Sequence, residues 1–86
     1  MKRKVKVIYL DHDGYMNYQR DVCERRTIKF NPEFHERMFR QSRKKNIDGV
    51  DYWPYECHPE FQPRKYWDIA EKYGFPVIEE LEWINL

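Results

Sequence analysis

Residues 4–14 have the sequence KVKVIYLDHDG, in which an alternating apolar pattern is followed by two aspartates and a glycine. Apolar side chains alternate with lysines and then close the run at Leu10, a pattern typical of a β-strand. Asp11 to Gly14 then supply turn-forming residues, and Gly14 is suited to a positive φ. The sequence therefore predicts a strand over 4–10 that ends in an acidic turn.

The rest of the chain alternates between strand-like and helix-like patterns, with residues 15–26 undecided. The patterns predict a strand over 27–30 that forms a hairpin with the first, a helix from 32 to about 45, a strand over 50–53, a helix over 64–73 and a strand over 77–84, where a short helix also fits. Asn31 and Pro32 are typical helix-starting residues. Pro54 ends its strand or puts it at an edge, and Gly74 is expected to terminate its helix. We expect a single α/β or α+β domain over 1–86, with two helices on a sheet of three to four strands.

Aromatic residues make up 17 % of the chain and Ala70 is its only alanine. Because aromatic side chains bury large areas, few of them are needed to build a small core. The core residues expected from the periodicity are Val5, Val7, Tyr9, Phe34, Met38, Ile69, Ala70 and Tyr73. No apolar run approaches the length of a membrane span, so we expect a cytoplasmic protein, a monomer or homodimer with no membrane partner. Cys23 and Cys57 are expected to be free thiols.

The formal net charge of +1 hides a gradient along the chain. Residues 1–46 hold 13 Lys and Arg against 6 Asp and Glu, whereas residues 47–86 hold 3 against 9. Part of the excess forms a stripe on the helix expected after Pro32. Its members are Arg37, Arg40, Arg43 and Lys44, which are candidate nucleic-acid-binding residues because such a stripe can track phosphates. The alternatives are a solvated helix face and mutual neutralisation of the two halves.

Tyr52, Trp53 and Tyr55 form an aromatic group in the acidic half of the chain. Such side chains anchor protein interfaces when they are exposed, and they form core when they are buried. We therefore treat these three residues as candidate partner-binding residues.

Asp11 and Asp13 are the candidate catalytic and metal-binding residues. Two carboxylates two residues apart, at the end of an apolar strand, can converge on a hard cation such as Mg²⁺. The alternative is an acidic turn whose side chains bond to nearby backbone N–H groups.

The stretch from Val7 to Met16 resembles the first motif of the haloacid dehalogenase-like phosphatase superfamily. The resemblance implies that Asp11 is a nucleophile forming an aspartyl-phosphate, that Asp13 is the general acid/base, and that Mg²⁺ is the cofactor. It is confined to this motif, and the later motifs of the family are not found. Tyr15 also stands where the family usually has Thr or Val.

A hairpin followed by a helix would also resemble the ββα-metal nuclease finger. In that case His12 would activate water, and Asn31 or His35 at the helix start would hold the metal.

Three functions follow from these patterns. The one favoured by the chain's size is a small non-enzymatic accessory protein, phage-type or regulatory, that docks onto a protein or nucleic-acid partner. The alternatives are a Mg²⁺-dependent phosphoryl-transfer protein that uses Asp11 and Asp13, and a metal nuclease.

Overall fold

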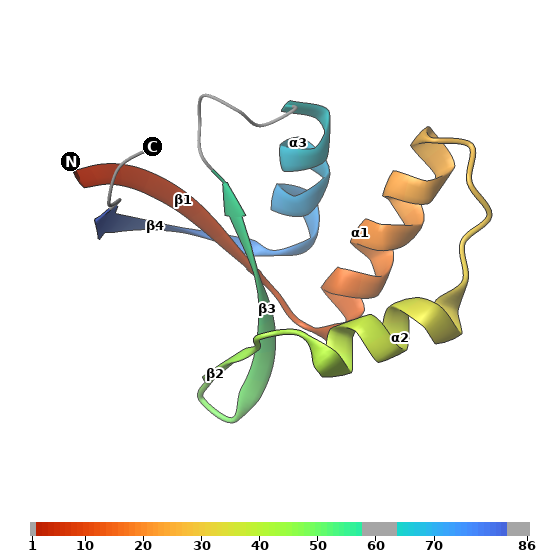
Figure 1. Cartoon of the computed structure of the whole chain (residues 1–86), viewed down its shortest axis with the longest axis horizontal. Coiled ribbons are helices and arrows are strands. Elements are labelled where there is room, and N and C mark those ends of the chain that lie inside the picture. Colours follow the sequence, from red (N-terminus) through yellow and green to blue (C-terminus); the bar gives the residue numbers. More distant parts are fainter. Residues whose placement is uncertain (1, 58–63, 83–86) are drawn as a thin grey trace.

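The computed structural model describes residues 2–57 and 64–82 of the 86-residue chain. Seven elements follow one another: β1 (Lys2–Leu10), α1 (His12–Arg25), α2 (Pro32–Gln41), β2 (Lys45–Ile47), β3 (Val50–Cys57), α3 (Arg64–Tyr73) and β4 (Phe75–Glu82). The strands form one antiparallel sheet in the order β2-β3-β1-β4 (Figure 1). This is the split β-α-β order called ferredoxin-like, with α2 added between α1 and β2. The α+β class is confirmed, and the described residues form three helices instead of the two expected.

Alternation along β1 separates two sets of buried side chains. Ile8 and Leu10, both 0 % exposed, join the main core with residues of all three helices. Val7 and Tyr9 form a second, smaller cluster, against which Ile47 and Tyr52 pack. Successive strand residues point to opposite faces, so α1 and α3 cover the Ile8 face of the sheet.

The acidic turn expected over 11–14 is instead the start of α1. Asp11 is the N-cap, and its Oδ1 accepts from the backbone N–H of Gly14 at 2.7 Å. Aspartate is as favourable at an N-cap as in a turn, so the local pattern fitted both outcomes. Packing favours the helix over the turn, because Tyr15 and Tyr18 on its apolar side are buried against Trp53 of β3.

The strand expected over 27–30 and its hairpin with β1 are wrong. The N–H of Ile28 bonds to the carbonyl of Cys23 at 2.8 Å, and that of Thr27 bonds to Glu24 at 3.1 Å. These two bonds form a Schellman motif, which ends α1 with Thr27 at a φ of 56°. The segment leads into α2, and β1 pairs with β3 and β4.

The helix α2 begins as expected, with the Asn31 side chain accepting from the N–H of Phe34 at 3.2 Å and Pro32 in the first turn. It ends at Gln41 instead of about Lys45, because the Ser42 hydroxyl donates to the carbonyl of Phe39 and the chain then enters β2.

The predicted core is confirmed at Val7, Tyr9, Ile69 and Ala70, and Tyr73 packs against it. It is wrong at Phe34 and Met38, which are 46 % and 45 % exposed. Phe39, on the same arc of α2, is buried instead. The side chain of Val5 lies outside the described residues.

A two-residue turn at Asp48 and Gly49 joins β2 to β3. Both residues have positive φ, 52° and 84°, as a type I′ hairpin turn requires. The strand expected over 50–53 runs to Cys57, with Pro54 inside it. Since β2 pairs only with residues 50–52 of β3, Pro54 has β1 alone as a neighbour and removes no bond to β2.

The helix α3 has its predicted bounds, and a strand follows it as β4 over 75–82. The helix ends directly before Gly74, as expected, but the φ of Gly74 is not positive, so this glycine does not have the left-handed conformation of a typical C′ residue. A Cβ there would lie 2.5 Å from side-chain atoms of both Ile8 and Leu10. Glycine at this position therefore lets the chain pass close to β1.

The pairing of β1 with β4 brings the basic and acidic ends of the chain together. Lys2 stands opposite Glu82 in the register, and Lys4 stands opposite Glu80. The register therefore brings the backbone of the basic N-terminal segment beside that of the acidic C-terminal segment.

Candidate functional site

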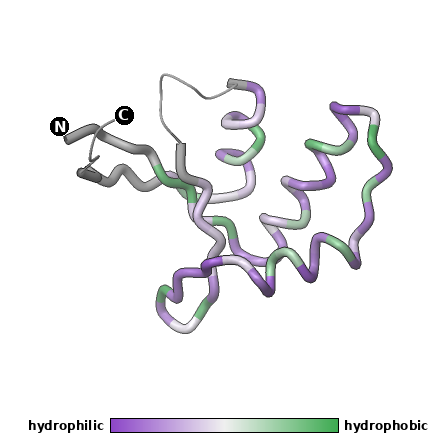
Figure 2. The backbone as a smooth tube through the Cα atoms, viewed as in Figure 1, coloured by the Kyte–Doolittle hydropathy of each residue, from purple (hydrophilic) through white to green (hydrophobic). Residues whose placement is uncertain are grey.

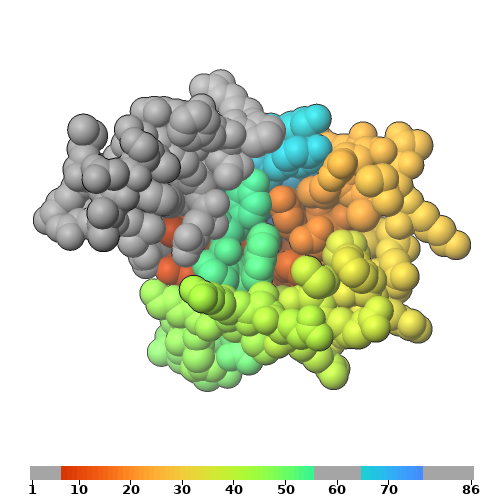
Figure 3. Space-filling view, viewed as in Figure 1, coloured from red at the N-terminus to blue at the C-terminus, as the bar shows by residue number. Residues whose placement is uncertain are grey.

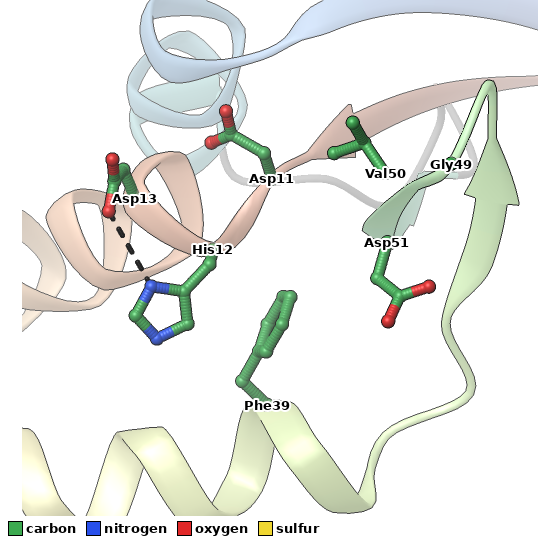
Figure 4. A pocket seen from close by; sticks show the side chains of 7 residues that line it. All are labelled: Asp11, His12, Asp13, Phe39, Gly49, Val50 and Asp51. Atoms are coloured by element: carbon green, nitrogen blue, oxygen red, sulfur yellow. Dashed lines mark ion pairs between the residues drawn. The ribbon is translucent and has the colours of Figure 1, made fainter.

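The predicted catalytic pair lies at the rim of an open hollow of about 420 Å³, where β1 ends. The hollow is lined by Asp11, His12, Asp13, Phe39, Gly49, Val50 and Asp51 (Figure 4). Its walls come from the start of α1, from α2, from the β2–β3 turn and from the first residues of β3.

The carboxylates of this hollow point in different directions (Figure 4). Asp11 bonds to its own helix, whereas Asp13 is 93 % exposed and lies 3.5 Å from Nδ1 of His12. Among residues 2–57 and 64–82, no group of three or more His, Cys, Asp and Glu side chains is placed to hold a metal ion. The Mg²⁺ site stays a prediction for Asp11 and Asp13.

His12 ties the start of α1 to α2. Its Nε2 bonds to a carboxylate oxygen of Glu36, and its ring meets that of Phe39 edge-on at 5.2 Å. Glu36 also accepts from Nε of Arg40 at 3.1 Å. The bond to Glu36 raises the pKa of His12 above its usual value, and the same bond lowers the pKa of Glu36. The i,i+4 spacing of Glu36 and Arg40 predicts an ion pair on a helix from the sequence alone. No local sequence pattern predicts the contact between His12 and Glu36, which are 24 positions apart.

The four predicted nucleic-acid-binding residues differ in their surroundings. Arg40 pairs with Glu36, while the Lys44 ammonium lies 4.0 Å from Asp51 and 5.5 Å from the centre of the Phe39 ring. Arg37 and Arg43 are exposed, and within the described parts of the chain neither meets a carboxylate. The stripe is therefore divided between two cations with a carboxylate neighbour and two that meet none among the described residues.

Phe34, Arg37, Met38 and Gln41 line a second hollow, of about 270 Å³, on the side of α2 away from α1. We call these four residues the outer side of α2, and Phe39 with His35 its inner side. Short apolar segments alternate with polar ones along this helix (Figure 2). In the space-filling view α2 forms part of the lower rim of the molecule (Figure 3). The sequence places Phe34 and Met38 on an apolar arc, but their exposure of 46 % and 45 % is visible only in the structure.

The candidate partner-binding aromatics are divided between the two faces of the sheet. Trp53 and Tyr55 pack against the main core, with Tyr18 at 6.1 and 5.4 Å between ring centres. Tyr52 lies on the other face, 5.1 Å from the ring of Phe75. Only Tyr52 of the three is outside the main core.

The residues of the nuclease resemblance have structural contacts of their own. Asn31 caps α2, and α1 replaces the expected hairpin before it. His35 stacks on Phe30 at 5.2 Å, and its Nε2 lies 3.9 Å from the thiol of Cys23. Its Nδ1 is buried without a hydrogen-bond partner in the described structure, and burial lowers the pKa of His35. Cys23 is a free, buried thiol, as expected, while the side chain of Cys57 lies outside the described residues.

No helix in the described part of the chain combines the length and apolar character needed to cross a membrane. No protein-family model matches the sequence, and no curated protein and no solved structure is significantly similar to it. The resemblance of residues 7–16 to the haloacid dehalogenase-like superfamily therefore stays a prediction.

Proposed function

We propose that this protein is a non-enzymatic binding protein that docks onto another protein through the outer side of α2. The observation that supports the proposal most is the exposure of Phe34 and Met38, 46 % and 45 %, one helical turn apart. Two large apolar side chains that are exposed side by side and line the same hollow are typical of an interaction site.

The composition of this surface also favours a protein partner. Phe, Met and Arg are enriched in protein interfaces, and the outer side of α2 holds Phe34, Arg37 and Met38. The unbranched Met38 side chain adapts its shape to what packs against it.

A nucleic-acid partner has less support from the same helix. Tracking a phosphate backbone requires several available cations, but Arg40 and Lys44 already have carboxylate neighbours. Glu33 lies in the first turn of α2 as well and repels phosphates.

Site-specific photo-crosslinking tests the proposal. The photoreactive amino acid p-benzoylphenylalanine replaces Phe34 in one protein and Ile28, which is 50 % exposed but outside the hollow, in a matched control. Both are irradiated in the cells that make the protein.

We expect a discrete, protease-sensitive adduct from position 34 and none of that size from position 28. The additional change Met38→Gln should remove the adduct. A nuclease-sensitive adduct would instead assign the surface to nucleic acid. Equal adducts from both positions, or none from either, would contradict docking through α2.

A further inference from the structure

We infer that the turn at Asp48 and Gly49 is a site of spontaneous isoaspartate formation, and that the side chain of Asn46 limits the rate of this modification. Two aspartates of the chain directly precede a glycine, Asp13 and Asp48. An aspartate in this position is the most reactive kind, because glycine has no side chain to hinder ring closure. The sequence marks both positions, and the structure distinguishes between them.

The reaction requires only water. The backbone nitrogen of Gly49 attacks the side-chain carboxyl carbon of Asp48, a C–N bond forms, and the proton of the nitrogen leaves with the carboxyl hydroxyl as one water molecule. The product is a five-membered succinimide ring. Water then opens the ring at one of its two carbonyls. Attack on the side-chain carbonyl restores aspartate, whereas attack on the main-chain carbonyl leaves the chain linked through the side chain, which is isoaspartate.

The glycine that follows Asp13 is held by a hydrogen bond and by packing. Gly14 is buried in the first turn of α1, and its N–H donates to Oδ1 of Asp11 at 2.7 Å. A Cβ at this glycine would collide with the backbone oxygen of Tyr73. Ring closure requires the peptide plane of the glycine to rotate, so these contacts must break first. We therefore expect Asp13 to react slowly in the folded protein.

The glycine that follows Asp48 has open space around it. A Cβ at Gly49 would have no atom within 4 Å apart from its chain neighbours. Asp48 is exposed and has no hydrogen-bond or ion-pair partner among the described residues. The peptide plane of Gly49 can therefore rotate without disturbing the core of the protein.

One side chain restrains this turn. The N–H of Gly49 donates to Oδ1 of Asn46 at 3.1 Å, and Nδ2 of Asn46 donates to Oδ1 of Asp51 at 3.0 Å. Because the Gly49 nitrogen must leave this bond before it reaches the carboxyl carbon, Asn46 slows the reaction. A single exposed hydrogen bond has a modest net strength, so its removal should speed isoaspartate formation about fivefold.

The modification should open the β2–β3 hairpin. Isoaspartate adds one carbon atom to the main chain, whereas a type I′ turn fits two residues of ordinary length. The strand β2 pairs only with residues 50–52 of β3. Nζ of Lys45 in β2 lies 3.1 Å from the hydroxyl of Tyr9, which is 4 % exposed. Loss of the hairpin should therefore uncover Tyr9.

The test is an ageing experiment on the purified full-length chain at neutral pH, folded and in urea. Peptide mapping with electron-transfer fragmentation then distinguishes isoaspartate from aspartate at each position. Asn46→Ala removes the restraint. The matched control Asn31→Ala removes a bond of the same kind, in which the asparagine oxygen accepts the N–H of the third residue after it. Circular dichroism checks that both variants are folded.

In the folded protein we expect isoaspartate to form at least about tenfold faster at position 48 than at position 13, because a surface turn opens more readily than a packed helix. In urea the two rates should be similar. Asn46→Ala should speed the reaction at position 48 alone, and Asn31→Ala should change neither position. Amide hydrogen exchange of residues 45–52 should be faster in the modified protein, with α1 unaffected.

A second readout uses Asp13→Asn and Asp48→Asn, in which ring closure releases ammonia and the product gains mass. Ammonia release should be fast for the second variant and slow for the first. Equal rates at the two positions in the folded protein, by either readout, would overturn the inferred site. A reaction at position 48 that Asn46→Ala leaves unchanged would reject the role of Asn46. Unchanged hydrogen exchange in the modified protein would contradict the opening of the hairpin.

Discussion

The two sides of α2 belong to one short helix, yet they contact different surroundings. On the inner side Phe39 is 5 % exposed and touches the rings of His12 and Tyr15. On the outer side Phe34 and Met38 remain nearly half exposed. The difference shows that an apolar arc is wider than the strip that a neighbouring element covers. An apolar residue beyond that strip is free for another role.

The largest effect is expected on the inner side. Phe39→Ala should lower the free energy of unfolding by about 3–5 kcal/mol, because it removes a buried aromatic ring and leaves a cavity. Urea unfolding followed by tryptophan fluorescence measures this cost. A loss below about 1 kcal/mol would mean that α2 does not pack on α1 as described.

A smaller effect is expected at Asp11, which starts the helix that α2 packs against. Asp11→Ala removes the cap and should cost about 1 kcal/mol, whereas Asp11→Asn keeps an N-cap acceptor and should cost little. Thermal unfolding of both variants measures the difference.

The variant Asp11→Asn also tests the predicted Mg²⁺ site. If Asp11 and Asp13 bind Mg²⁺, millimolar Mg²⁺ will raise the melting temperature of the wild type but not that of Asp11→Asn. Equal melting temperatures with and without Mg²⁺ in the wild type would leave Asp11 as a helix cap only.

His12 of α1 and His35 of α2 predict opposite responses of stability to pH. The pKa of His12 is raised, so its stabilising contribution is present below about pH 6.5 and is lost as the pH rises through the folded-state pKa. The pKa of His35 is lowered, so its contribution is present above about pH 6.5 and is lost as the pH falls. Measuring the free energy of unfolding between pH 5 and 9, for the wild type and for a variant of each histidine, separates the two contributions.

The wild type should exceed His12→Gln in stability most at the acidic end of this range, and the gap should narrow as the pH rises. The gap between the wild type and His35→Gln should narrow in the opposite direction. Parallel pH profiles for both variants would contradict the bond between His12 and Glu36.

Local signals account for the parts of the fold that were predicted correctly. The cap at Asn31, the bounds of α3 and the strand nature of β1 follow from neighbouring residues. The start of α1 was missed because Asp11 and Gly14 suit both a turn and a cap, and tertiary contacts of Tyr15 choose between them.

The candidate site was less predictable because it depends on contacts between distant residues. His12 and Glu36 are 24 positions apart, and the register of β1 with β3 and β4 is set by the whole sheet. The aromatic run of β3 was divided by strand alternation, which sends Tyr52 and Trp53 to opposite faces. The β2–β3 hairpin is the exception, since Asp48-Gly49 is a recognised local signal for a two-residue hairpin turn.

The smallest expected effect on stability tests the central claim that the outer side of α2 is not part of the core. Phe34→Gln and Met38→Gln are each measured by urea unfolding beside Phe39→Ala. We expect each to cost less than about 1 kcal/mol, because exposed positions tolerate polar side chains. A loss of about 2 kcal/mol or more at either position would show that the outer side stabilises the fold, and would contradict its assignment as a docking surface.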